Sequence, residues 1–150
     1  MLGTLALWAV LIAQAPDSAA QARYGVALRT VGDSLTALEA AAARFRADLV
    51  NASPDLVISR ATRLTARCAG ALHQARRLDS LLATETRLRR ELAALRAALV
   101  RCAKDFATGP WYQGADSVQA WAPYRLARLD DAVRRYRLAA REFMHRLQIQ

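Results

Sequence analysis

The sequence predicts an all-α fold: an elongated antiparallel up-down four-helix bundle with coiled-coil-like heptad seams and a disulfide between its second and third helices. The composition favours helices, because 34 of the 150 residues are alanine and only six are glycine and four proline. Four segments space their apolar residues by three and four positions, as helices with one buried face do. Two cysteines lie symmetrically about the polar break between the second and third segments.

The four apolar seams define the expected helices, and none of their positions carries a charge. The first two seams read Tyr24, Leu28, Val31, Leu35, Leu38, Ala42, Phe45 and Leu49, then Val57, Ala61, Leu64, Cys68, Ala71, Ala75, Leu78 and Leu82. The last two read Leu88, Leu92, Leu95, Leu99, Cys102 and Phe106, then Ala122, Leu126, Leu129, Val133, Tyr136, Ala140, Phe143 and Leu147. Short connections between such helices make neighbours antiparallel. The alternative architecture is a long hairpin that forms a homodimer, with the first and fourth helices pairing across chains.

The cysteine spacing indicates a hairpin and a disulfide together. Residue 85, within the break at 82–86, is 17 positions from both Cys68 and Cys102. At 1.5 Å per residue each cysteine is about 25 Å from the bend, so the two lie at the same level. Both belong to apolar seams, which favours a Cys68–Cys102 disulfide over two buried thiols. Disulfides persist in oxidising compartments, so the pair also indicates export.

The helix boundaries follow from capping residues. Ser53, Pro54 and Asp55 are typical of a helix start, as the N-cap, the first helical residue and an acid at the positive end of the dipole. Thr84 or Thr86 can cap the third helix, and Gly109-Pro110 is a stop signal for it. The fourth helix is expected to open at Asp116-Ser117 or later. Pro123 then either kinks its first turns or marks its true start.

The first 22 residues resemble a secretory signal peptide. The run 2–13 is apolar and uncharged, too short for a bilayer span of about 20 residues, and small residues suited to cleavage follow it. Cleavage after Ala20 or Ala22 is expected, although no Lys or Arg precedes the run. We therefore divide the chain into a signal peptide, residues 1–22, and one helical-bundle domain, residues 23–150. The localisation expected is periplasmic or extracellular, with membrane association if the segment is retained.

The charge balance favours an acidic partner. The chain carries 22 basic and 13 acidic residues, a net charge of +9, and removal of residues 1–22 would take away one acid and no base. Such a field attracts acidic proteins, polyanions or anionic lipid surfaces. Nucleic acid is not expected, because no nucleic-acid-binding motif is present. The candidate basic patch, outside the seams, consists of Arg63, Arg67, Arg89, Arg96, Arg128 and Arg135.

A second candidate surface is aromatic. Trp111, Tyr112, Trp121 and Tyr124 cluster around the connection 108–124. Exposed tryptophan and tyrosine favour interfaces, which would make this cluster a binding patch. The competing interpretation, which we favour, is a plug of large aromatic side chains over the end of the bundle.

No catalytic or cofactor site is expected. Glu142 and His145 form one Glu-x-x-His, whereas a di-iron bundle needs two such motifs and two further inward carboxylates. His73 and His145 lie off the seams, and Cys-x-x-Cys-His is absent, so neither haem ligation nor a metal site is favoured. Nucleophile-elbow, phosphate-loop and His-Glu-x-x-His motifs are also absent, and adjacent Asp130 and Asp131 do not converge on one point.

The function expected is that of an exported basic binding or interaction module, chaperone-like in one version. The segment 35–39, Leu-Thr-Ala-Leu-Glu, resembles the Leu-Thr-x-x-Gln element of a periplasmic stress-chaperone family but departs at Glu39 and has no second copy. The chain is therefore not assigned to that family. The alternatives are a haem- or metal-carrying bundle and a membrane-anchored structural coiled coil that retains residues 1–22.

Overall fold

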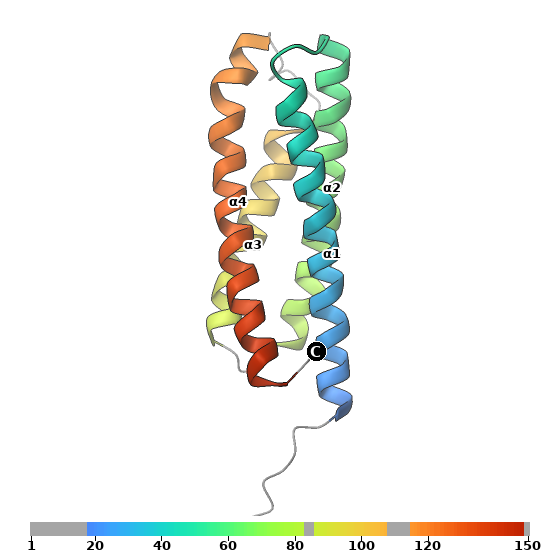
Figure 1. Ribbon diagram of the computed structural model, residues 1–150, viewed down its shortest axis with the longest axis vertical. Helices are drawn as coiled ribbons and strands as arrows, with labels where there is room; N and C mark the ends of the chain where they lie inside the picture. Colours follow the sequence, from blue (N-terminus) through green and yellow to red (C-terminus); the bar gives the residue numbers. More distant parts are fainter. Residues whose placement is uncertain (1–17, 83–85, 108–114, 149–150) are drawn as a thin grey trace, which may run out of the picture.

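The computed structural model describes residues 18–82, 86–107 and 115–148, and within them the chain forms four antiparallel helices (Figure 1). Their bounds are Ser18–Asp48 for α1, Pro54–Leu81 for α2, Thr86–Asp105 for α3 and Ala115–Arg146 for α4. Each helix packs against the next, and α4 returns to pack against α1. The architecture is therefore the expected up-down four-helix bundle, with α1 and α4 paired within one chain.

The connection between α1 and α2 confirms the capping residues expected there. The Ser53 side-chain oxygen accepts a hydrogen bond from the backbone N–H of Leu56 at 3.4 Å. Pro54 opens α2, and Asp55 lies in its first turn. These residues satisfy or complement backbone N–H groups that the helix itself leaves unpaired. The Thr84 and Gly109-Pro110 signals lie outside the described residues.

The apolar seams form the core. Every expected seam residue is buried except Tyr24 and Leu147, which are partly buried and pack against the core. The described residues bury no charged side chain. A 3-4 repeat turns one stripe of each helix inward, and four such stripes close a core along the axis. The seams therefore predicted the core apart from Ala132 and Ala139 of α4.

The fourth helix departs from expectation at its start. It begins at Ala115, before the predicted start at Asp116-Ser117 or later. Pro123 lies inside the helix and does not mark its beginning. The helix can continue past proline when one backbone hydrogen bond is given up. Ala132 and Ala139 are buried beside the expected seam, which widens the inward face of this helix.

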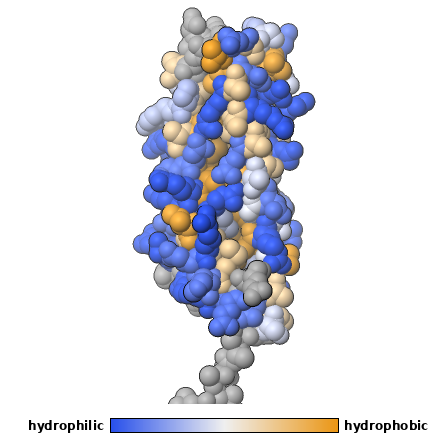
Figure 2. All heavy atoms as spheres, viewed as in Figure 1, coloured by the Kyte–Doolittle hydropathy of each residue, from blue (hydrophilic) through white to orange (hydrophobic). Residues whose placement is uncertain are grey.

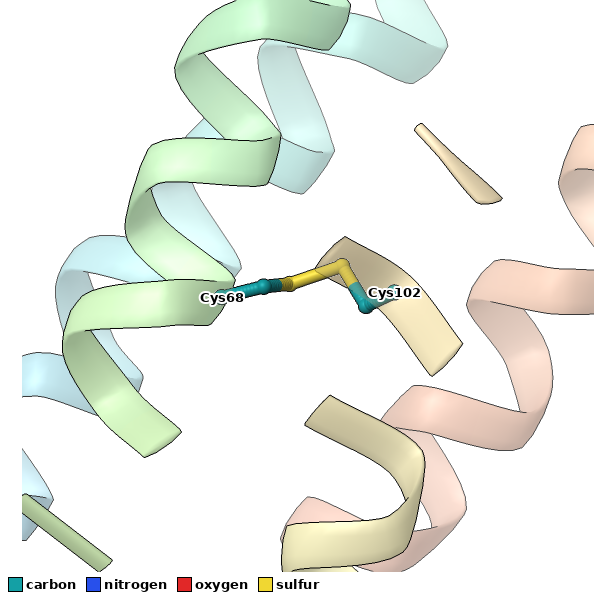
Figure 3. Close-up of a disulfide and its surroundings, with 2 residues drawn as sticks. All are labelled: Cys68 and Cys102. Carbon is teal, nitrogen blue, oxygen red and sulfur yellow. A yellow bond between two sulfur atoms is a disulfide. The ribbon is translucent and has the colours of Figure 1, made fainter. Parts of the chain in front are cut away.

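The expected disulfide joins α2 to α3 (Figure 3). The Cα atoms of Cys68 and Cys102 are 6.1 Å apart across the helix pair, and both side chains are buried. The bond closes the hairpin about 17 residues from its bend on each arm. The level and the face inferred from the spacing are therefore both confirmed.

Aromatic contacts strengthen both ends of the bundle. At the end that holds the α1–α2 connection, Phe106 contacts Phe45 edge to face at 5.2 Å and Trp121 at 5.4 Å. At the opposite end, Tyr24 contacts Phe143 at 5.6 Å and donates a hydrogen bond to the backbone oxygen of Leu81. Edge-to-face pairs of this kind add to the energy of burial.

Within the described residues, no helix has both the length and the apolar character needed to cross a membrane. The segment expected to be a signal peptide falls mostly outside the described residues. Its last five residues, 18–22, belong to α1, where the Gln21 side-chain amide donates to the backbone oxygen of Leu147 at 2.8 Å.

Candidate interaction surface

The arginines expected to form one basic patch occupy different boundaries between helices. Seen from the α1 and α4 side, hydrophilic side chains cover most of the surface, with hydrophobic ones in short patches along its length (Figure 2). Whether a basic side chain can serve a partner depends on which acids it already contacts.

At the α2–α3 boundary the expected arginines are held by an acid of the same chain. Arg96 donates to a carboxylate oxygen of Asp79 at 2.6 Å, and Arg89 lies 3.9 Å from the other oxygen. Asp79 is partly buried, which strengthens the pairs relative to fully exposed ones. Arg89 and Arg96 therefore join α2 to α3 rather than standing free for a partner.

At the α3–α4 boundary the charges are balanced in part. Arg135 lies 3.3 Å from Asp131 and 3.8 Å from Glu91, and Arg125 lies 3.2 Å from Asp105. The Arg128 guanidinium stands over the Tyr124 ring, 5.6 Å from its centroid. These side chains rim a groove of about 470 Å³ whose floor includes Cys102. Two carboxylates, those of Asp105 and Asp131, line this groove together with its basic side chains.

The boundary between α4 and α1 is also bridged by ion pairs. Arg46 on α1 pairs with Asp130 on α4. Arg137 on α4 donates to Glu39 at 2.7 Å and to the Thr36 hydroxyl at 3.2 Å. Glu39, the residue at which the chaperone-like element departs from its pattern, thus serves a contact within the bundle.

The α1–α2 boundary differs, because several of its arginines lack an acidic partner among the described residues. Within the described residues, no carboxylate lies at ion-pair distance from Arg63 or Arg67 of α2, or from Arg44 of α1. Arg60, beside them, pairs with Asp48 at 2.6 Å. These four arginines rim a hollow of about 520 Å³ with an alanine lining. We call it the arginine groove.

Sequence reasoning found Arg63 and Arg67 but missed Arg44 and Arg60. The groove forms where the flank of α1 meets the flank of α2. A seam shows which side of each helix faces the core, but it does not show which flanks of neighbouring helices come together. One signal was nonetheless present, because no acid stands three or four positions from Arg63 or Arg67. Such residues have no local partner on their own helix.

A second hollow lies on the same boundary, between the beginning of α1 and the end of α2. It has a volume of about 640 Å³, and Arg23, Arg77, Val26 and Leu81 are among its lining residues. Val26 is 59% exposed and Leu81 37% exposed, so this hollow offers apolar contact. Gly70 lies on the α2 flank between the two hollows, and a Cβ atom there would meet nothing within 4 Å.

The aromatic residues divide between the two interpretations. Trp121 is partly buried and stacks near Phe106, as a plug would. Tyr124 is 63% exposed and contacts Arg128, as a surface residue would. Trp111 and Tyr112 lie outside the described residues, so the plug and the binding patch both remain predictions.

The residues considered for a metal or haem lie on the surface. His73, His145 and Glu142 are exposed, and Glu142 pairs with Arg87 of α3. Within 18–82, 86–107 and 115–148, no three His, Cys, Asp or Glu side chains come together in a way that could hold a metal ion.

Two groups have shifted pKa values, and neither lies in the arginine groove. The hydrogen bond from Arg134 lowers the pKa of the partly exposed Asp131 carboxyl. Burial raises the pKa of the Tyr136 phenol, whose hydroxyl has no hydrogen-bond partner in the described structure.

Comparison with protein-family models, with curated proteins and with solved structures finds no match to this chain.

Proposed function

We propose that the protein is an exported binding module. It binds an acidic partner through the unpaired arginines of the α1–α2 boundary. The observation that carries the proposal is the uneven distribution of ion pairs. Among the described residues, the α3–α4 boundary carries three ion pairs between its helices, and the α2–α3 and α4–α1 boundaries carry two each. The α1–α2 boundary carries one, Arg60–Asp48, whereas Arg44, Arg63 and Arg67 stand together there without a carboxylate at ion-pair distance.

Charge complementarity gives these arginines a use that stability does not. Three like charges along one groove repel one another, and none of the three gains the attraction that an ion pair would give. A carboxylate or phosphate placed between guanidinium groups can accept two hydrogen bonds from each. The groove therefore favours a partner that brings negative charge.

The disulfide supports the proposal that the protein works in an exported location. The Cys68–Cys102 bond indicates a non-reducing environment. Periplasmic or extracellular localisation, and removal of residues 1–22, are the finer parts of the proposal. A chaperone-like role is the version in which the partner is an acidic segment of an unfolded chain.

A salt titration tests the proposal. Purified protein with its disulfide intact is measured against labelled poly-L-glutamate, and against vesicles with and without phosphatidylglycerol, at about 20 mM and 150 mM salt. Binding should occur at low salt and weaken at least tenfold at physiological salt, because the screening length falls to about 8 Å. No binding to any acidic probe at low salt would refute the proposed function.

Intact mass and an absorbance spectrum of native material address the alternatives. The proposal expects the mass of the processed chain and no absorbance beyond that of protein. A bound haem or metal in stoichiometric amount would instead favour the carrier, and retention of residues 1–22 would favour the membrane-anchored coiled coil.

A further inference from the structure

We infer that the α1–α2 boundary is the docking site of a single acidic amphipathic helix from a partner protein. This inference rests on the proposed function and names its site and the class of its partner. Four features carry it: the length of the boundary, the charges on its rims, the small side chains on its floor and the apolar residues at its far end.

The two hollows lie in line along one pair of helices. The arginine groove reaches Arg44 on α1, and the second hollow includes Val26 on the same helix. These residues are 18 positions apart, which is about 27 Å along a helix. A partner helix of about 18 residues has the same length.

The rims of the groove suit carboxylates on both flanks of such a helix. Arg44 stands on the α1 rim, and Arg63 and Arg67 stand one helical turn apart on the α2 rim. An occupant between them can present Asp or Glu to both sides. The planar guanidinium matches a carboxylate in two-point hydrogen bonding.

The floor admits a helix and suits a membrane poorly. Ala37, Ala40, Ala41 and Ala66 line the arginine groove, so no bulky side chain fills it. Helix axes approach most closely where the contacting side chains are small. Membrane-surface helices instead insert bulky apolar side chains, and here the apolar floor is recessed behind charged rims.

The far end of the boundary gives the occupant a direction. Val26 and Leu81 are exposed there and offer contacts to apolar side chains. Asp33 is exposed on the same flank of α1 by helical spacing and would repel an acid near the middle. Four arginines line the arginine groove, against two, Arg23 and Arg77, in the second hollow. The partner helix should therefore carry most of its acids toward Arg44 and its apolar anchors toward Val26.

A pair of peptides of equal composition tests the inference. The first is an 18-residue helical peptide with an Ala/Leu stripe and Glu residues flanking that stripe in one half. The second has the same residues in an order that forms no stripe. Binding of each to the purified protein is measured at low salt, together with phosphatidylglycerol vesicles as a competitor.

Two tryptophan variants locate the site. Ala40→Trp with Ala66→Trp fills the arginine groove without changing its charge, since both alanines line it and are exposed. Ala97→Trp with Ala127→Trp fills the α3–α4 groove in the same way and serves as the control. Circular dichroism and thermal unfolding establish that both variants fold.

The inference predicts that the striped peptide binds at least tenfold more tightly than the scrambled one. Filling the arginine groove should then weaken that binding at least tenfold, and the control should leave it within twofold. Equal binding of both peptides, or no effect of Ala40→Trp with Ala66→Trp, would overturn the helix site while leaving salt-dependent binding intact. Displacement of the striped peptide by anionic vesicles would assign the surface to lipid instead.

Discussion

At the scale of residues, Cys68 and Cys102 join the hairpin of α2 and α3 covalently. The disulfide joins buried positions 34 residues apart in sequence. In the loop-entropy account, closing a loop of that length restricts the unfolded chain by about 4 kcal/mol. The two sulfur atoms also fill core space that smaller side chains would leave empty.

Replacing both cysteines, as Cys68→Ala with Cys102→Ala, should lower the free energy of unfolding by about 2–4 kcal/mol. Denaturant unfolding with and without reductant measures the effect. Reduction should destabilise the native protein by a similar amount and leave the double variant unchanged. Two alkylatable thiols in freshly isolated native protein would contradict the disulfide account.

Tyr136 is the largest buried side chain that carries an unsatisfied polar group. It is 2% exposed, and its hydroxyl lacks a partner in the described structure. A buried hydroxyl without a hydrogen bond costs about 1–3 kcal/mol. The ring thus stabilises the core while the hydroxyl reduces the gain.

Tyr136→Phe should therefore leave the stability unchanged or raise it by about 1 kcal/mol. Tyr24→Phe is the matched control, because it removes a hydroxyl that donates to the backbone oxygen of Leu81, and it should lower the stability slightly. Thermal unfolding of both variants at pH 7 gives the comparison. A clear loss for Tyr136→Phe would reveal a hydrogen bond at this hydroxyl.

The raised pKa of Tyr136 adds a pH dependence. Above pH of about 10 the phenol ionises in the unfolded chain but stays protonated in the folded one, so unfolding becomes easier. The contribution is constant below that pH and is lost progressively above it. Tyr136→Phe should lack this component in unfolding measured between pH 9 and 11.

At the scale of elements, the helices and their buried faces could be predicted from the sequence. A 3-4 repeat of apolar residues places them all on one side of an α-helix. Val31, Leu35 and Leu38 are examples of seam residues that the structure buries almost completely. Flank pairing could not be predicted, since the seam leaves open how each helix is rotated against its neighbour. Arg44 and Arg60 were missed for that reason.

The start of α4 shows a second limit of sequence reasoning. Proline is disfavoured in a helix interior, yet Pro123 lies eight residues after Ala115, the first residue of α4. Packing of Ala122 and Leu126, both buried, outweighs the local preference. Tertiary contacts of this kind do not appear in the propensity of a single residue.

Pro123→Ala should stabilise the protein by up to about 3 kcal/mol, because it allows the missing backbone hydrogen bond and removes a steric clash. The side chain is exposed, so little packing is lost. The converse variant, Ala127→Pro at another exposed position of α4, should destabilise strongly. A decrease in stability for Pro123→Ala would contradict the helical account of this segment.

The beginning of α1 bears on the expected signal peptide. Residues 18–22 are helical, and Gln21 contacts Leu147, so cleavage after Ala20 keeps a contact that cleavage after Ala22 removes. We expect the mature protein to lack about the first 20 residues. Amino-terminal sequencing that finds Met1 on the mature chain would contradict export by cleavage.

At the scale of the whole molecule, the distribution of charge matters more than its sum. The sequence contains an excess of arginine, and from this excess we predicted an acidic partner. Only the fold separates arginines that join helices, such as Arg96, from those that stand without acids, such as Arg63. Half of the predicted patch, Arg89, Arg96 and Arg135, contacts acids of the chain itself.

Charge reversal on two faces tests the central claim most directly. Arg44→Glu with Arg63→Glu and Arg67→Glu changes the α1–α2 boundary, and Arg101→Glu with Lys104→Glu and Arg128→Glu makes an equal charge change on the α3–α4 side. Binding to poly-L-glutamate is measured for both, after thermal unfolding has established that both fold. The account predicts at least a tenfold loss for the first triple variant and a loss below threefold for the second. Equal losses, or a larger loss for the second, would contradict it.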